Sequence, residues 1–227
     1  MGIEYRYELK YLISSQDAYL LKNQLSKIMK KDPHSVNDSY SYLIRSLYFD
    51  DPYHSAYLDK TEGNQIRHKY RIRKYNLNDD VISLECKHKD DNMTYKESCR
   101  ISKETCEALI DGSYRCKDDD PVLLKRFLAE CSGQMLKADV IVDYKRLALV
   151  YPVSEVRITF DEEIRSGDPG GFFKNDLPTV PVFPEGHCVL EVKCNEFIPV
   201  HILNVIAQVP KIRQAVSKFA SCRGIRF

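Results

Sequence analysis

The chain has 227 residues, 43% of them hydrophobic, and a formal net charge of +1. This length fits one domain with a large core, expected to span residues 1–227. The balanced charge excludes the overall basic excess typical of non-specific nucleic-acid binding, so no nucleic-acid partner is expected.

Neither a membrane span nor a secretion signal is expected. No apolar run approaches the roughly 20 residues that a bilayer-crossing helix needs, and the N-terminus lacks the apolar core of a signal peptide. The eight cysteines include no Cys-x-x-Cys spacing. We therefore expect a cytoplasmic protein with free thiols and no zinc site.

The first predicted element is a strand over residues 3–13, where polar and apolar side chains alternate. Arg6, Glu8 and Lys10 share its charged face, because successive side chains of a strand point to opposite sides.

Three further elements are predicted before residue 61. A helix begins at Ser14 or Ser15 and continues to about Lys31, where Asp-Pro ends it. A strand follows over residues 40–50, and then a short helix over 53–60.

Residues 67–89 predict a β-hairpin whose turn is the Asn- and Asp-rich stretch 76–80. The alternation places five cations and one carboxylate on one surface of the two strands. These residues are Lys69, Arg71, Arg73, Glu85, Lys87 and Lys89.

The same alternation continues through strands predicted at 94–101, 140–151, 156–161 and 188–194. Their charged faces carry Lys96, Arg100, Arg146, Arg157, Asp161, Glu191 and Lys193. Helices are predicted between these strands and after Pro199. A final basic helix is expected to hold Lys211, Arg213, Ser217, Lys218 and Phe219 and to stop at Gly224. Its cations could touch a membrane surface or line the mouth of a tunnel formed by the strands, and we favour the mouth.

At least seven strands thus pair one apolar face with one charged face. This pattern predicts an α+β fold, with a closed antiparallel β-barrel that has a charged lumen and is surrounded by helices. So many cations facing one another would be costly without an anion. A phosphate chain would supply that anion, and the interspersed carboxylates are natural ligands of Mg²⁺ or Mn²⁺.

Eight motifs carry a resemblance to a known family. They are Arg6-x-Glu8-x-Lys10-Tyr11, Leu47-Tyr-Phe-Asp50, Lys69-Tyr-Arg-Ile-Arg73, Leu84-Glu-Cys-Lys87, Asp143-Tyr-Lys-Arg146, Val156-Arg-Ile-Thr-Phe-Asp161, Val189-Leu-Glu-Val-Lys193 and Ser217-Lys218-Phe219. With them the chain resembles the triphosphate tunnel metalloenzymes, or CYTH-like superfamily, and within it the VTC (vacuolar transporter chaperone) domain. Arg6 stands where the superfamily usually has the first Glu of Glu-x-Glu-x-Lys, which matches the VTC branch better.

The resemblance implies a polyphosphate polymerase that moves the terminal phosphoryl of ATP onto a growing polyphosphate chain and uses Mn²⁺ or Mg²⁺. It implies catalytic roles for Arg71, Arg73, Lys87 and Arg157. The expected phosphate-binding residues are Arg6, Lys10, Lys69, Lys89, Arg100, Arg146, Lys193, Ser217 and Lys218. The expected metal ligands are Glu191, Glu85 and Glu8. Family relatives work beside transmembrane proteins, so a membrane link would require a separate membrane-protein partner.

Two other functions remain open at this point. A metal-dependent triphosphatase would give the phosphoryl group to water in the same tunnel, and its product would be free phosphate. A sensor without catalytic activity would bind polyphosphate or phosphate with the same cations. A purely structural domain would leave the lumen cations unexplained.

Overall fold

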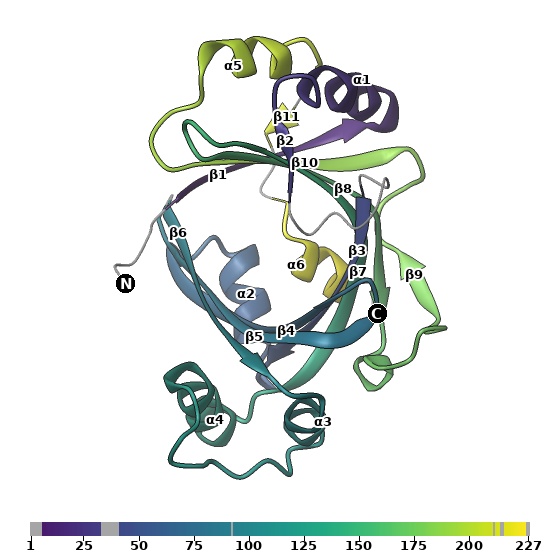
Figure 1. Cartoon of the computed structure of the whole chain (residues 1–227). Helices are drawn as coiled ribbons and strands as arrows, with labels where there is room; N and C mark the ends of the chain where they lie inside the picture. Colours follow the sequence, from purple (N-terminus) through teal and green to yellow (C-terminus); the bar gives the residue numbers. More distant parts are fainter. Residues whose placement is uncertain (1–5, 33–40, 92, 211, 214–215, 226–227) are drawn as a thin grey trace.

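A closed ring of strands forms the frame of the molecule. The computed structural model describes residues 6–32, 41–91, 93–210, 212–213 and 216–225. Within these residues, eight antiparallel strands follow one another in the order β7-β3-β4-β5-β6-β1-β10-β8, and β8 pairs back with β7 (Figure 1). The ring strands are β1 (Arg6–Ser14), β3 (Ser41–Asp50), β4 (Ile66–Tyr75), β5 (Asn78–Asp90), β6 (Met93–Ile101), β7 (Lys137–Tyr151), β8 (Val156–Gly167) and β10 (His187–Cys194). The predicted α+β class and closed antiparallel barrel are confirmed.

Apolar side chains cover the outer wall of the ring, where helices pack against them. Helices α1 (Ser15–Leu25) and α5 (Val200–Ile206) share one core cluster with Leu190 and Val192 of β10. Helices α3 (Lys103–Asp111) and α4 (Val122–Gln134) share another with Leu84 of β5. The two helical layers lie on opposite sides of the ring (Figure 1). Burial of these outer faces turns the charged faces of the same strands inward.

Two short helices lie inside the ring: α2 (Ser55–Thr61) and α6 (Lys218–Gly224) (Figure 1). Phe219 of α6 is 1% exposed and stacks on Tyr48 with ring centroids 5.0 Å apart. A seven-residue helix is too short to be stable alone, so packing within the ring must support it. Part of the interior is therefore apolar, whereas the sequence predicted a charged lumen.

The hairpin of β4 and β5 forms as predicted, but with a shorter turn. Asn76 and Leu77 have φ angles of 51° and 54°, and positive φ at both central residues is typical of a type I′ turn. β5 already begins at Asn78. The prediction of a turn over 76–80 was wrong because the polar composition of 78–80 was read as loop, although these residues extend the strand beyond the core.

The first helix is shorter than predicted and ends at Leu25. Lys30 and Lys31 instead form the short strand β2, which pairs with Val150 and Leu149 of β7. Residues 30–31 form a strand instead of the end of the helix because they pair with the edge of β7. Local sequence propensity cannot predict this pairing, since it depends on a distant segment.

The final helix is also shorter than predicted, because residues 212–213 form β11, which pairs with β1. Helix α6 begins at Lys218, with Ser217 as its N-cap, and its Phe219 is buried against Tyr48 of β3. Lys211 falls outside the described residues.

The remaining elements are a 3₁₀ turn, η1 (Pro169–Gly171), and the edge strand β9 (Thr179–Pro181). All eight cysteines are free, as predicted. No helix in the described part of the chain combines the length and apolarity that crossing a bilayer requires.

Candidate functional site

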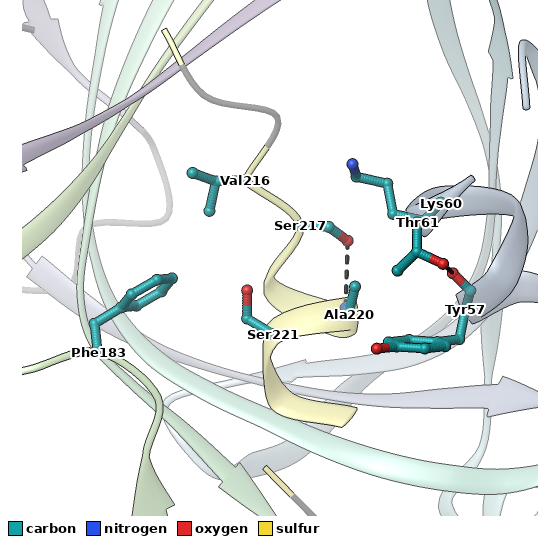
Figure 2. Close-up of a pocket in the computed structure, with 8 residues that line it drawn as sticks. All are labelled: Tyr57, Lys60, Thr61, Phe183, Val216, Ser217, Ala220 and Ser221. Atoms are coloured by element: carbon teal, nitrogen blue, oxygen red, sulfur yellow. Dashed lines mark hydrogen bonds between the residues drawn. The ribbon is translucent and has the colours of Figure 1, made fainter. Parts of the chain in front are cut away.

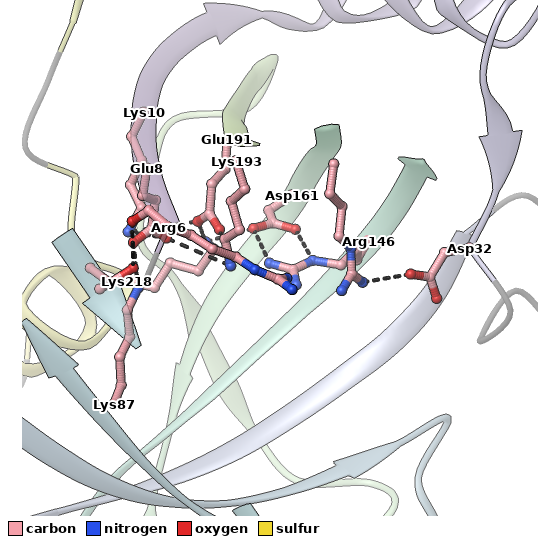
Figure 3. Close-up of polar contacts among 12 residues, drawn as sticks. Arg6, Glu8, Lys10, Asp32, Lys87, Arg146, Asp161, Glu191, Lys193 and Lys218 are labelled. Atoms are coloured by element: carbon pink, nitrogen blue, oxygen red, sulfur yellow. Dashed lines mark hydrogen bonds and ion pairs between the residues drawn. The ribbon is translucent and has the colours of Figure 1, made fainter. Parts of the chain in front are cut away.

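Two carboxylates on neighbouring strands form the centre of the site. Glu8 of β1 and Glu191 of β10 lie beside each other on the inner face, with Lys10 Nζ 3.5 Å from Glu8 and 3.6 Å from Glu191. Lys193 Nζ is 2.8 Å from Glu191 and 3.8 Å from Glu8, and Lys87 also contacts Glu8 (Figure 3). We call Glu8 and Glu191 the carboxylate pair.

Asp161 of β8 is the third carboxylate in this part of the ring and is fully buried. It accepts two hydrogen bonds from Arg146, of 2.6 and 2.7 Å, and Lys218 Nζ lies 2.6 Å away (Figure 3). Burial alone would raise the pKa of Asp161, but Arg146 and Lys218 outweigh it and hold that pKa below its ordinary value. Asp161 therefore fixes two cations from different elements while remaining ionised.

Glu85 of β5 organises a separate group of cations. Its carboxylate lies 2.6 Å from Arg71 and 2.7 Å from Lys96, with Arg73 at 3.8 Å. Arg71 also donates to the Tyr48 hydroxyl at 2.9 Å. Both strands of the hairpin thus contribute to one rigid, charge-paired unit.

Arg73 is held by neutral oxygens in addition to Glu85. It donates to the hydroxyls of Ser46 and Tyr144, both at 3.0 Å. Tyr144 also lies beneath Arg146 and Lys218, each 5.2 Å from the ring centroid. Aromatic side chains of β3 and β7 therefore contact these cations, in part through cation–π interactions.

Arg157 of β8 lies with Asp32, 2.8 Å from its carboxylate, and donates to the Tyr42 hydroxyl at 3.3 Å. Its buried Nε has no hydrogen-bond partner within the described residues. Asp32 was not identified from the sequence, because it was read as the end of a predicted helix rather than as part of an alternating strand.

Lys69 of β4 differs from the other predicted cations. Its ammonium makes no ion pair with any carboxylate in the described part of the chain and lies 5.2 Å from the Phe219 ring centroid. Burial, together with Lys87 and Lys10, brings the pKa of Lys69 well below its usual range. An unpaired cation among other cations is the arrangement expected where a bound anion supplies the missing charge.

The interior is therefore net positive even with its carboxylates ionised. The clusters described above hold ten cations and five carboxylates. The cations are Lys10, Lys69, Arg71, Arg73, Lys87, Lys96, Arg146, Arg157, Lys193 and Lys218, and the carboxylates are Glu8, Asp32, Glu85, Asp161 and Glu191.

One predicted phosphate-binding residue, Arg100, lies away from these clusters. Arg100 is exposed and donates to the carbonyl oxygen of Asp80. Lys89 and Arg6, at the end of β5 and the start of β1, are half-buried. Figure 3 shows Arg6 among the residues around Glu8 and Lys193, and the charges of Glu8 and Lys10 act on the pKa of Lys89. The structure thus does not bring Arg100 together with the other lumen cations, because β5 and β6 extend beyond the interior at that end.

Ser217, predicted to bind phosphate, accepts a hydrogen bond from the Ala220 N–H at 3.3 Å and so caps α6. It also lines a pocket of about 390 Å³ between α2 and α6, with Tyr57, Lys60 and Ser221 among the other lining residues (Figure 2). Lys60 was not identified from the sequence, since a single lysine on a short helix carries no signal.

The carboxylate pair meets the requirements of a divalent cation. Glu8 Oε1 is buried without a hydrogen-bond partner, and the surrounding lysines lower the pKa of Glu8 to about 2 against burial and the Glu191 charge. The described residues include no group of three or more protein ligands, but Mg²⁺ and Mn²⁺ commonly take one or two carboxylates and complete their shell with phosphate oxygens and water. Glu85, the third predicted metal ligand, is bound to Arg71 and Lys96 and shares no ion-pair partner with the carboxylate pair among the described residues.

The protonation of Lys87 leads to a testable pH dependence. Burial and the neighbouring Lys10 and Lys193 lower the pKa of Lys87 to about 7, although Glu8 opposes this. Because this pKa lies below the unfolded value, the contribution of Lys87 to folding stability increases as the pH rises above about 7. A bound polyanion would restore the charge, so we expect binding of tripolyphosphate near pH 8.5 to take up about one proton more than in Lys87→Gln.

Calorimetry in buffers of different ionisation enthalpy measures this uptake. The free ligand titrates identically in both proteins, so the difference isolates Lys87. Equal proton uptake by the two proteins would contradict the assignment.

Comparison with known proteins gives one family and several related folds. A family model of the VTC domain matches residues 5–226. A proposed adenylate cyclase from Bacillus halodurans is similar in structure, with a TM-score of 0.52, 16% identity, and coverage of 92% of this chain and 89% of that one. No match was found among curated proteins.

Two further structures are more distant. The PH1819 protein of Pyrococcus horikoshii has a TM-score of 0.48 at 12% identity, covering 97% of this chain and 100% of that one. The mimivirus capping-enzyme triphosphatase has a TM-score of 0.41 at 12% identity, covering 91% of this chain and 87% of that one.

Proposed function

We propose that this chain, which belongs to the VTC domain family, is a metal-dependent polyphosphate polymerase acting on ATP. The observation that supports this most directly is the charge of the clusters on the inner face, where ten described cations accompany five carboxylates. A linear, densely charged phosphate chain would supply the missing negative charge without any need for base recognition.

The proposed reaction is a phosphoryl transfer. An anionic oxygen at the end of the acceptor chain forms a bond to the γ-phosphorus of ATP, while the bond from that phosphorus to the β–γ bridging oxygen breaks and ADP leaves with the electron pair. Because the attacking oxygen is already ionised, no general base is required. Positioning and charge stabilisation account for most catalysis of this type.

The residues of the ring would divide this work. Arg146 and Lys218, both fixed by Asp161, would hold phosphate oxygens in one orientation. Arg71 and Arg73, held by Glu85, Tyr48 and Ser46, would present guanidinium groups that bind two oxygens at once. These cations need little reorganisation when negative charge develops on the transferring group.

A divalent cation fits this arrangement. Glu8 and Glu191 would hold Mn²⁺ or Mg²⁺ through carboxylate oxygens, including the buried Glu8 Oε1 that has no hydrogen-bond partner. When bound, the ion would neutralise phosphate charge and polarise the phosphoryl group. The surrounding lysines keep both carboxylates ionised and therefore ready to bind it.

The test is incubation of purified protein with ATP and Mn²⁺, followed by a gel stained for polyphosphate and a parallel assay of free phosphate. Chains that require both ATP and metal would support the proposal. Free phosphate without chains would replace it with a triphosphatase. If neither product forms but added polyphosphate binds, the protein is a sensor.

A further inference from the structure

One stretch of the inner wall carries cations that make no ion pair with any carboxylate in the described part of the chain. Lys10, Lys87, Lys193 and Lys218 each lie within 4 Å of Glu8, Glu191 or Asp161. In contrast, Lys60, Arg67, Lys69 and Lys89 make no ion pair with a carboxylate in the described ranges, although all four are half-buried. We call these four residues the basic track.

The strand register places the track's charges against each other. Arg67 of β4 lies directly opposite Lys89 of β5, and Lys69 lies opposite Lys87. Like charges at directly opposed positions destabilise a sheet. Two successive pairs of this kind are therefore a cost that the fold alone does not explain.

Helix α2 adds a further cation to the same place. Burial and the charges of Arg67, Lys10 and Lys89 lower the pKa of Lys60. Burial is also the largest cause that lowers the pKa values of Arg67 and Lys89, although Asp59 opposes it at Arg67, and Asp91 and Glu8 oppose it at Lys89. Lys60 also lines the pocket of about 390 Å³ beside Ser217, so open space adjoins the track (Figure 2). Three separate elements thus direct cations to one region that has room for a ligand.

The basic track extends the cation-lined inner wall in the direction away from the carboxylate pair. The pairing of Lys69 with Lys87, which contacts Glu8, joins the two regions. From Lys69 to Arg67 the strand advances two residues, or about 7 Å. A triphosphate held with a metal ion at Glu8 and Glu191 would not need cations at this added distance.

We propose that the basic track is a second anion subsite, which binds the part of a polyphosphate chain that extends beyond the nucleotide's three phosphates. This inference rests on the proposed function, since it assigns the acceptor chain to one end of the same tunnel. A triphosphatase would have no use for such a subsite. The track therefore also bears on which reaction the tunnel carries out.

The test compares two ligands in the double variant Lys60→Gln/Arg67→Gln. We expect affinity for long-chain polyphosphate to fall about tenfold or more, with affinity for tripolyphosphate changed by less than about twofold. The slope of log affinity against log salt for the long chain should decrease by about two, roughly one for each cation removed. The control Lys117→Gln/Lys125→Gln removes the same charge from the outer surface and should change neither affinity.

Equal losses for both ligands would overturn the proposal, because the track would then belong to the triphosphate site. No loss for either ligand would also overturn it and make the track a solvated surface. Circular dichroism checks the fold, and the single variants Lys60→Gln and Arg67→Gln replace the double if it does not fold.

The two proposals can fail separately, because binding is measured without turnover. If long chains bind through the track but ATP yields no polyphosphate, the proposed function fails and the subsite stands. If polyphosphate is made while the double variant binds long chains normally, the subsite fails and the function stands.

Discussion

Replacing Arg45 with methionine should lower the free energy of unfolding by about 3–5 kcal/mol, the usual effect of removing one partner of a buried ion pair. Arg45 lies on the outer face of β3 and is 2% exposed. Its Nε and Nη2 atoms donate to Asp143 on β7, at 2.9 and 2.7 Å, and Nη1 donates to the carbonyl oxygens of Gly171, Phe172 and Lys174. The variant would leave a buried carboxylate and three carbonyl oxygens without this donor.

Denaturant unfolding measures the effect, and two controls define its origin. Lys145 lies on the same strand β7 as Asp143 and makes an exposed ion pair with Glu163 of β8. Lys145→Met removes this pair and should lower the free energy of unfolding by less than about 1 kcal/mol. The double variant Arg45→Met/Asp143→Leu removes both charges and should recover much of the loss. A cost below about 1 kcal/mol for Arg45→Met would show that the pair contributes no more than a surface contact.

The hairpin explains why much of the site could be predicted from sequence. The alternation in residues 67–89 assigns Arg71 and Glu85 to the inner face, and a single tight turn then fixes their pairing. The same reasoning placed Lys10 and Glu191 on inner faces, where the register of β1 and β10 sets them opposite each other. A strand's period of two is a local property, so it can be read without knowledge of the fold.

Contacts between distant segments could not be predicted in this way. Arg157 meets Asp32, and Lys218 meets Asp161, only because the ring closes and α6 enters it. The expectation of mutually repelling cations was therefore incomplete, since most of them have a carboxylate partner. One signal for the inserted helix was available: the aromatic Phe219 directly follows Lys218 in a tail that carries several basic residues.

The apolar part of the interior has a similar explanation. Tyr48 and Tyr144 occupy inner positions on β3 and β7, where other strands carry charges, and they pack around α6. An aromatic residue on the charged face of a strand therefore indicated that something packs against it. The identity of the packed element depends on where the chain returns, which alternation does not encode.

Replacing Glu191 with glutamine should strongly reduce metal-dependent turnover while leaving nucleotide binding without metal intact or stronger. Glu191 is 3% exposed and lies between Lys193 at 2.8 Å, Lys10 at 3.6 Å and Lys218 at 3.9 Å. The amide keeps the shape of the side chain but removes one of the two negative charges that would hold the cation. We expect turnover to fall at least about a hundredfold, since a bound metal contributes several kcal/mol to transition-state stabilisation.

Glu85→Gln is the matched control, because it removes a buried lumen carboxylate that holds Arg71 and Lys96 instead. We expect this variant to raise the KM for ATP by loosening Arg71, while the Mn²⁺ concentration for half-maximal activity stays unchanged. In Glu191→Gln that concentration should rise sharply, and direct calorimetric titration with Mn²⁺ should show weaker binding. Unchanged Mn²⁺ binding in Glu191→Gln would remove Glu191 from the metal site. A shifted Mn²⁺ requirement in Glu85→Gln alone would move the site to the hairpin, where the cations around Glu85 would then have to be displaced by the metal.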